Sequence, residues 1–218
     1  GDTMFVIAYE FVAKTHPSLL PQVLILFNDT ARKVCEGQQY DMNFETQDEV
    51  TISDYTMMIR LKTAVLIACS LKLGAIIAGA KEEEAERIYE AGIELGLAFQ
   101  LQDDYLDAFG DVAKFGKSIG NDITTNKKTY LYLKARELAS PEQLQQFDRF
   151  CNDHSFTAQE KIDGILGLYR DLNIDKITRA EIENRHNHAL QIIDEFGFAD
   201  GAAHQLKTLM NEMLAREK

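Results

Sequence analysis

The stretch YTMMIRLKTAVLIACSLKLGAIIAG, residues 55–79, decides the fold of this chain. On a helix this segment is apolar on nearly all sides, which is typical of a helix in the centre of a bundle. Ser53 or Asp54 is expected to cap its start. Apolar residues recur at helical spacing along almost the whole sequence, whereas strand-like alternation is hard to find. We therefore predict an all-α protein.

Further helices are predicted on both sides of this segment. A capping signal before Pro141 and a capping box at Thr157 and Glu160 mark two of the starts. Residues 111–126 lack helical periodicity and are expected to form a functional loop. The other helices are expected at about residues 3–15, 22–45, 81–110, 127–138, 141–152, 157–172, 175–196 and 200–216.

Composition limits the class of protein. A chain of 218 residues, 45% of them hydrophobic, is expected to form one domain over residues 1–218. Its formal charge of -12 argues against nonspecific binding to nucleic acid or anionic lipid, which need a basic face. Three dispersed cysteines and the lack of a long apolar run predict a cytoplasmic protein without a membrane span. The sequence begins without Met and already shows helical periodicity at its first residues, which indicates a fragment.

An acidic cluster lies in the otherwise largely apolar stretch FQLQDDYLDAFGD, residues 99–111. On a helix, Asp103 and Asp107 lie about 40° apart and Asp104 about 100° from Asp103. Three carboxylates so close repel one another unless a cation lies between them. Oxygen ligands without nearby His or Cys favour Mg²⁺, with Mn²⁺ as an alternative, completed by substrate phosphates.

A solvated acidic helix end is the alternative interpretation, and the spacing alone leaves both open. Apolar neighbours favour the metal site, because a solvated face would not be built this way. Gln100 falls near the same face, where it can bind a ligand, orient a carboxylate or simply pack. The apolar neighbours are Phe99, Leu101, Leu106, Ala108 and Phe109.

Several cations are candidates for binding a diphosphate. Lys62, next to Thr63, lies in an apolar run, where an ammonium group is unfavourable unless it meets an anion or reaches the surface. Lys117, Lys127 and Lys128 follow the aspartates, although lone lysines usually serve only solvation. Metal together with lysines describes a diphosphate site.

The same helices offer an apolar lining, although plain core packing explains it as well. Diphosphate at one end and hydrocarbon at the other would describe a prenyl diphosphate. The candidate lining residues are Leu66, Ile67, Leu71 and Phe99.

The sequence resembles the trans-isoprenyl diphosphate synthases, the family of farnesyl and geranylgeranyl diphosphate synthases. FQLQDDYLDAFGD followed by GKSIGNDI and NKKT is similar to the second aspartate-rich motif and the loop of that family. KTA at residues 62–64 and GQQYDMNFE at residues 37–45 match two further motifs in the right order. The resemblance covers essentially the whole chain and implies a helical bundle of the isoprenoid synthase type around a central cavity.

The resemblance also implies an activity. The family condenses isopentenyl diphosphate with an allylic diphosphate and uses three Mg²⁺ ions to polarise the leaving group. Asp103 is expected to ligate Mg²⁺ directly, while Asp104 and Asp107 hold it through water or shape the site. Thr63 and Gln100 are placed near the reacting carbon.

Substrate-binding residues follow from the same resemblance. Lys62, Lys117 and Lys127 are expected to clamp the allylic diphosphate, and Phe99 and Gln100 to contact the substrate. The implied roles of Gln38 and Asp41 are less specific, and Arg216 is expected at the isopentenyl diphosphate site.

The sequence departs from the family in one respect. The family's first DDxxD motif, which precedes the segment GDTMF, does not occur here, so we expect the N-terminal third to be missing and this fragment to be inactive. Product length is not readable. The resemblance implies a homodimer, to which MFVIAYEF and VLILF can contribute apolar faces, although burial within one chain explains these residues as well. A class I terpene cyclase and a noncatalytic regulatory subunit are the alternatives.

Overall fold

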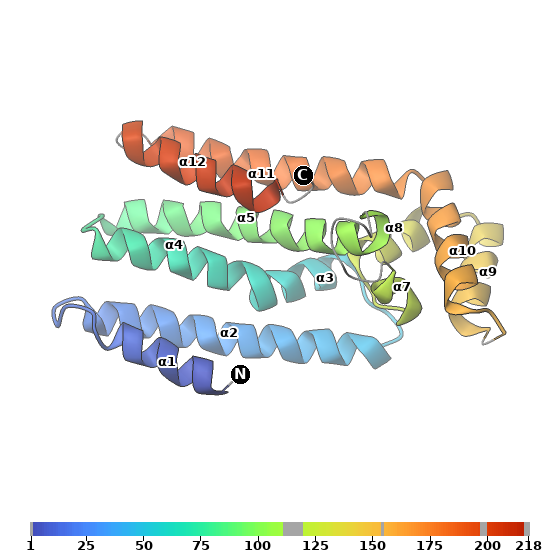
Figure 1. Ribbon diagram of the computed structural model, residues 1–218, viewed down its shortest axis with the longest axis horizontal. Coiled ribbons are helices and arrows are strands. Elements are labelled where there is room, and N and C mark those ends of the chain that lie inside the picture. Colours follow the sequence, from blue (N-terminus) through green and yellow to red (C-terminus); the bar gives the residue numbers. More distant parts are fainter. Residues whose placement is uncertain (1, 111–119, 154, 197–199, 216–218) are drawn as a thin grey trace.

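The computed structural model describes residues 2–110, 120–153, 155–196 and 200–215, and this part of the chain is helical without a strand, as predicted (Figure 1). The elements are α1 (Asp2–Val12), α2 (Leu20–Thr46), α3 (Ile52–Ile59), the π-helical turn η1 (Arg60–Ala64), α4 (Val65–Ile77), α5 (Glu82–Phe109), α7 (Asn121–Thr124), α8 (Tyr130–Leu138), α9 (Pro141–Asn152), α10 (Ala158–Asp171), α11 (Ile174–Phe196) and α12 (Asp200–Leu214).

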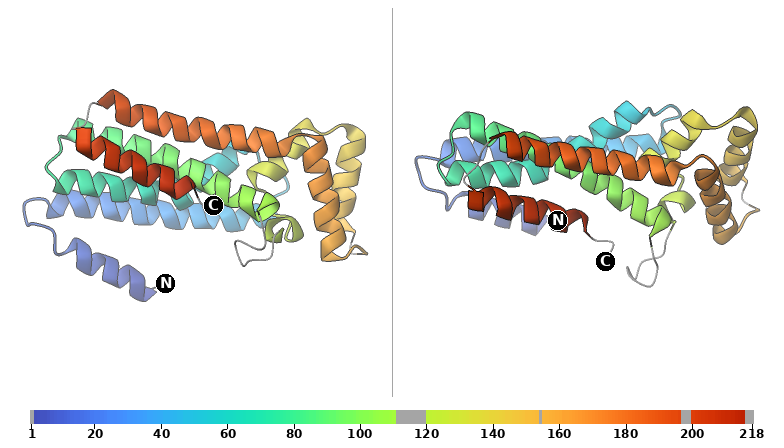
Figure 2. Two further views of the ribbon diagram at one scale, coloured as in Figure 1. Left: turned by 45° about the horizontal axis from the view of Figure 1, so that its top comes forward. Right: turned by 90° about the horizontal axis from the view of Figure 1, so that it is seen from above.

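The long helices lie side by side, and α5 is at their centre. It packs against α4 on one side and against α11 on the other, while α2 covers α4 and η1. The shorter helices α7 to α10 gather at one end of the bundle, as Figure 2 shows from two further directions. The C-terminal half of α5 therefore points toward the end where α7 and α8 lie.

Local signals explain where several helices begin. Ser140 caps α9 ahead of Pro141, and Thr157 forms a capping box with Glu160 at the start of α10, as predicted. Helix α8 begins at Tyr130 rather than at residue 127, because Thr129 is its N-cap.

The prediction of one continuous central helix was wrong in two respects. Its N-cap is Thr51, with Asp54 as the third residue of a capping box, rather than Ser53 or Asp54. It also changes to a π-helical turn at Arg60–Ala64 before continuing as α4. Such turns are rare and are found mainly at functional sites. Here the turn carries Lys62 and Thr63.

Close helix contacts at glycine hold this turn in place. A Cβ atom on Gly37 of α2 would lie 2.3 Å from the backbone nitrogen of Lys62, and one on Gly96 of α5 would lie 2.4 Å from Cα of Ala64. The turn is therefore pressed between two helix backbones, at positions where no larger residue fits without movement.

Two further expectations differ from the structure. Helix α4 is not apolar and buried all round, since Leu66 is 50% and Ile77 59% exposed. The segment expected as a loop contains the short helix α7, while its residues 111–119 lie outside the described part.

None of the described helices combines the length and the hydropathy that crossing a membrane would require.

Candidate active site

The three aspartates of α5 occupy different environments. Asp103 is exposed, and no hydrogen-bond partner is found for it within the described residues. Asp107 is partly buried, and its Oδ2 accepts a hydrogen bond from the backbone N–H of Asp122, 2.9 Å away. Asp104 is only 3% exposed. The step of about 100° between neighbouring residues turns Asp104 into the bundle and Asp103 out of it.

Asp104 is held by two hydrogen bonds inside the core. The hydroxyl of Tyr55 on α3 donates to its Oδ2 at 2.6 Å, and Nε2 of Gln100, one turn earlier on α5, donates to its Oδ1 at 3.0 Å. Both carboxylate oxygens are thus engaged, as a buried carboxylate requires.

The π-helical turn brings the predicted Lys62 and Thr63 to the same region. Nζ of Lys62 forms an ion pair with Asp41 of α2 at 2.5 Å, so the ammonium does find an anion. The hydroxyl of Thr63 donates to Oε1 of Gln100 at 2.8 Å, which links the turn directly to α5.

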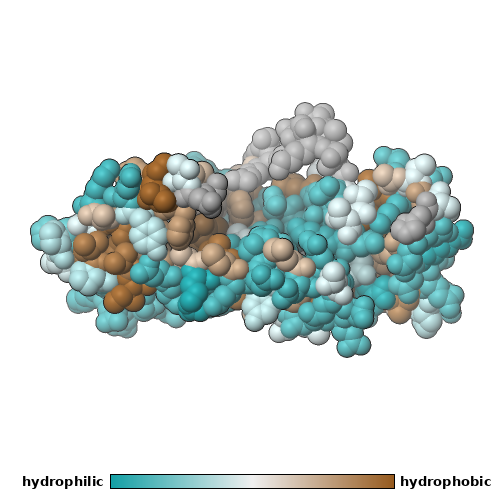
Figure 3. Space-filling model, turned by 90° about the horizontal axis from the view of Figure 1, so that it is seen from below, coloured by the Kyte–Doolittle hydropathy of each residue, from teal (hydrophilic) through white to brown (hydrophobic). Residues whose placement is uncertain are grey.

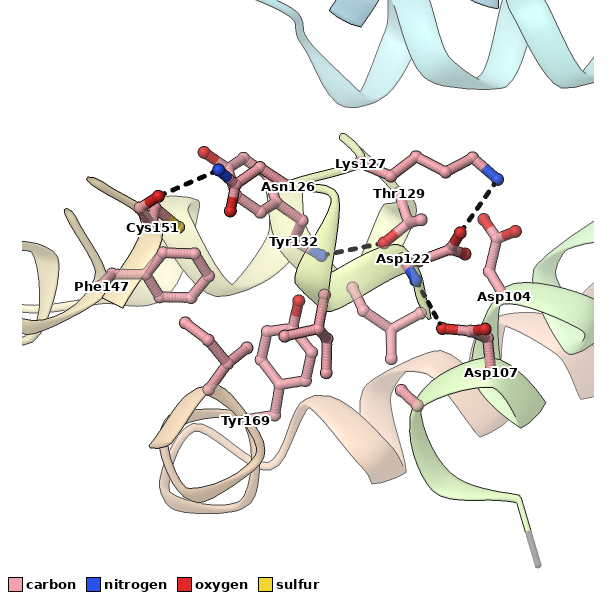
Figure 4. Close-up of a pocket in the computed structure, with 14 residues that line it drawn as sticks. Asp104, Asp107, Asp122, Asn126, Lys127, Thr129, Tyr132, Phe147, Cys151 and Tyr169 are labelled. Carbon is pink, nitrogen blue, oxygen red and sulfur yellow. Dashed lines mark hydrogen bonds and ion pairs between the residues drawn. The ribbon is translucent and has the colours of Figure 1, made fainter. Parts of the chain in front are cut away.

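Asp122, at the start of α7, is a site residue that the sequence analysis did not single out. Its carboxylate lies 3.4 Å from Nζ of Lys127, and its backbone N–H meets Asp107. Figure 4 shows the Lys127 side chain extending toward Asp122, with the Asp104 carboxylate beside it. The sequence signal that could have identified it is Gly120, because a glycine favours a turn just before this acidic residue. In the structure Gly120 has a φ of 82°.

A cleft of about 300 Å³ opens between the end of α2 and the segment that follows α7. Asp41, Tyr55 and Lys127 are among the residues that line it. A second cavity of about 10 Å³, the size of one water, lies between Asp104, Asp107 and Asp122. Of the predicted residues, Asp41 and Lys127 therefore line the cleft, while Asp104 and Asp107 line the smaller cavity.

Burial and charge act in opposite directions on these groups. Burial raises the pKa of Asp104 to about 6, although Lys127 and the hydrogen bond from Tyr55 oppose it. Burial also raises the pKa of Asp122 against the effect of Lys127. Burial lowers the pKa of Lys127, but the carboxylates of Asp104, Asp122 and Asp41 outweigh it and the net shift is upward. The site holds an excess of negative charge.

The donor set fits a hard divalent cation in part. Within the described ranges, no three His, Cys, Asp or Glu side chains are arranged to enclose a metal ion. Asp103 offers its carboxylate, and Asp107 keeps one oxygen beyond its bond to Asp122, whereas both oxygens of Asp104 are engaged. Two carboxylates completed by water and phosphate oxygens are a usual environment for Mg²⁺.

Some predicted residues are not brought to this cleft. Leu66 is exposed, Ile67 packs toward α11 and α12, and Leu71 packs toward α2, so these three do not line one common cavity. Adjacent helix positions diverge by about 100°, which separates them. Gln38 is exposed on α2, and Phe99 is half-buried. Lys117 and Arg216 lie outside the described residues.

Comparisons with known proteins place the chain among prenyl synthases. It is 42% identical over 141 residues to the short chain isoprenyl diphosphate synthase of Methanothermobacter thermautotrophicus, and 37% identical over 139 residues to the geranylgeranyl diphosphate synthase of Methanosarcina mazei. These matches cover 64% and 63% of this chain and 43% of each relative, so the chain spans about two fifths of the curated relatives' length where they match.

Solved structures agree with this relationship. A geranylgeranyl pyrophosphate synthase superposes with a TM-score of 0.91 at 41% identity, covering 100% of this chain and 67% of that one. The geranylgeranyl pyrophosphate synthetase of Pyrococcus horikoshii gives a TM-score of 0.88 at 29% identity, covering 99% and 65%. The family description Polyprenyl synthetase matches residues 1–169, and the chain belongs to this family.

Proposed function

We propose that the protein containing this chain is a trans-prenyltransferase, which condenses isopentenyl diphosphate with an allylic prenyl diphosphate. The observation that carries the proposal is the direct contact between η1 and α5. There the Thr63–Gln100 hydrogen bond lies next to Asp104, and Lys127 lies next to the carboxylates. Lysines and metal-binding carboxylates suit a diphosphate group, and the nearby side-chain oxygens of Thr63 and Gln100 suit the reactive carbon attached to it.

The residues of this chain supply binding and orientation. Lys62 and Lys127 donate hydrogen bonds to diphosphate oxygens, and Lys62 exchanges its contact with Asp41 for the substrate. Asp103 and Asp107 hold Mg²⁺, which when bound stabilises the negative charge of the departing diphosphate. The oxygens of Thr63 and Gln100 face the allylic carbon, where positive charge develops.

The bond changes are those of an electrophilic alkylation. The allylic C–O bond breaks and diphosphate leaves with the electron pair. The double bond of isopentenyl diphosphate then supplies the electrons of the new C–C bond, and a proton is lost to restore a double bond.

The test uses the full-length protein with isopentenyl diphosphate, an allylic diphosphate and Mg²⁺. A longer prenyl diphosphate is the expected product, and calorimetry with a nonhydrolysable allylic diphosphate is expected to show binding that depends on Mg²⁺. A hydrocarbon formed without isopentenyl diphosphate would indicate a terpene cyclase instead. Absence of both metal-dependent binding and turnover by the protein alone would point to a noncatalytic subunit.

We also propose that the protein is a homodimer that uses the apolar surface of α1 and the first half of α2. Phe11 is 66% and Ile25 71% exposed, and Figure 3 shows hydrophobic side chains gathered toward this end of the molecule. Exposed apolar patches of this kind mark interaction surfaces. Light scattering is expected to give twice the chain mass, and Ile25→Glu to shift it toward the monomer. An unchanged mass for Ile25→Glu would remove this face from the interface.

The compartment we propose is the cytoplasm. Cys35, Cys69 and Cys151 are all free thiols, which suits a reducing environment. Fractionation of cells that express the protein would test it, and recovery with the membrane pellet would contradict it.

A further inference from the structure

Three hydrogen bonds connect the core of the protein to the π-helical turn. They run from the Tyr55 hydroxyl to Asp104, from the Gln100 amide to Asp104, and from the Thr63 hydroxyl to Gln100, at 2.6, 3.0 and 2.8 Å. Their members come from α3, α5 and η1. Tyr55 is the buried end of this series, and Thr63, in the π-helical turn, is the other end.

The direction of each hydrogen bond in the series is fixed by whether each group can donate or accept. An ionised carboxylate only accepts, so Gln100 has to turn its NH₂ group toward Asp104. Its Oε1 then faces Thr63, whose hydroxyl has to donate. The proton of Thr63 is therefore occupied by Gln100, and the lone pairs of its oxygen remain for a positive centre in the substrate.

Tyr55 holds the far end of this arrangement. It is 1% exposed and Asp104 is 3% exposed, so both groups are largely screened from bulk water. The two donors to Asp104 approach different oxygens, which fixes the plane of the carboxylate. Without the Tyr55 hydroxyl the carboxylate is free to rotate about its Cβ–Cγ bond, and the Gln100 amide loses its fixed acceptor.

We propose that Tyr55 is a positioning residue of the prenyl transfer reaction, acting through Asp104 and Gln100 to fix the atom that Thr63 presents to the allylic carbon. Tyr55 does not itself touch the reacting atoms. The proposal rests on the proposed function and extends it to a residue 49 positions away from Asp104 in the sequence.

The kinetic test compares Tyr55→Phe with Tyr130→Phe in the full-length protein. Tyr130 is a suitable control because it is buried in the same core cluster, and no hydrogen bond of its hydroxyl is found among the described residues. Loss of a hydrogen bond to a charged group predicts a kcat about 10-fold lower for Tyr55→Phe, with KM for both diphosphates within about twofold of wild type. Tyr130→Phe is expected to retain the wild-type kcat.

A spectroscopic test is independent of turnover. In protein labelled with ¹⁵N-glutamine, the side-chain amide signal of Gln100 is identified by its loss in Gln100→Ala. This signal is expected to shift or broaden in Tyr55→Phe and to stay unchanged in Tyr130→Phe. An unchanged signal would show that Tyr55 does not control the amide and would overturn the proposal.

The outcomes separate the two claims. If the wild-type protein is active and Tyr55→Phe has the same kcat, the role of Tyr55 is wrong while the proposed function stands. A change confined to KM would also overturn that role. If the wild-type protein forms no prenyl product, the proposed function fails, and the role of Tyr55 in that reaction fails with it.

Discussion

Nζ of Lys128 lies 2.6 Å from the carbonyl oxygen of Phe44 and also donates to the carbonyl of Gln47. A lysine next to the candidate site therefore closes the C-terminus of α2, where carbonyl groups lack partners within the helix. Its neighbour Lys127 points the other way, toward Asp122. Of these two adjacent lysines, Lys128 thus stabilises the end of α2, while Lys127 faces the acidic residues of the candidate site.

This difference predicts separate effects of two substitutions. Lys128→Met should lower the free energy of unfolding by about 1–2 kcal/mol, because two carbonyl groups lose a charged donor, and leave diphosphate affinity unchanged. Lys127→Met should weaken the binding of inorganic diphosphate with Mg²⁺ about 10-fold. Urea unfolding and calorimetry measure the two quantities. Equal effects of both substitutions on affinity would contradict the division.

Asp103 is predicted to matter for activity and not for stability. Its carboxylate is exposed and lies near other carboxylates, so Asp103→Ala should keep or raise the melting temperature because like-charge repulsion is relieved. Activity of the full-length enzyme should fall by several orders of magnitude, on the order of 10³-fold or more. The exposed Asp48 is a matched control, and Asp48→Ala should retain activity. A marked drop in melting temperature for Asp103→Ala would make this carboxylate structural.

Asp104 predicts a dependence of stability on pH. Burial raises its pKa in the folded protein to about 6, above the ordinary aspartate value of 3.8, so the folded state holds the proton more tightly than the unfolded state. Stability from this group is present in full below about pH 4 and is lost as the pH rises through about 6. The loss amounts to roughly 3 kcal/mol.

The measurement compares wild type with Asp104→Asn by urea unfolding between about pH 4 and pH 8, with a chelator present to remove divalent metal. The substituted protein should lack this decline and be the more stable of the two at pH 8. Parallel pH profiles of the two proteins would exclude a raised pKa for Asp104. Comparison with the variant cancels the contributions of other carboxylates.

The contact between Gly37 and η1 predicts a stability effect. A methyl group on Gly37 would lie 2.3 Å from the nitrogen of Lys62 and 2.7 Å from the carbonyl carbon of Leu61, so helix α2 or the turn must move. Gly37→Ala should therefore destabilise the protein by about 1–3 kcal/mol. Gly74, in α4, has nothing within 4 Å of an added Cβ, and Gly74→Ala should stabilise by up to about 1 kcal/mol. Thermal unfolding of both variants tests the pair, and a neutral Gly37→Ala would refute the close packing.

Sequence periodicity was sufficient for the helices, because burial of apolar stripes determines where they form. The capping boxes at Thr157 and Ser140 are local signals and were readable for the same reason. The π-helical turn was not predicted, since its residues fit an ordinary helical pattern and the turn depends on contacts with α2 and α5.

Parts of the site were readable and parts were not. The lysine in an apolar run, Lys62, required an anion, and Asp41 supplies it. Tyr55 and Asp122 were missed because their contacts join segments far apart in the chain, and no local pattern records them. Asp104 was grouped with its neighbours by spacing, whereas tertiary contacts place it in the core.

The π-helical turn has a consequence for the phase of the helix that it interrupts. Tyr55, Met58 and Ile59 form a buried face, and in a regular α-helix the next residue on that face would be Lys62. The wider turn brings Ala64 onto that face instead and leaves Lys62 in an ion pair with Asp41. Deleting one residue between positions 60 and 64 would restore the regular repeat and keep Ala64 on the buried face, whereas a regular α-helix with all residues kept would rotate one half of the helix against the other by about 100°. The direction of the Lys62 side chain thus depends on the number of residues in the turn. Side-chain substitutions in a regular helix would not reproduce that direction.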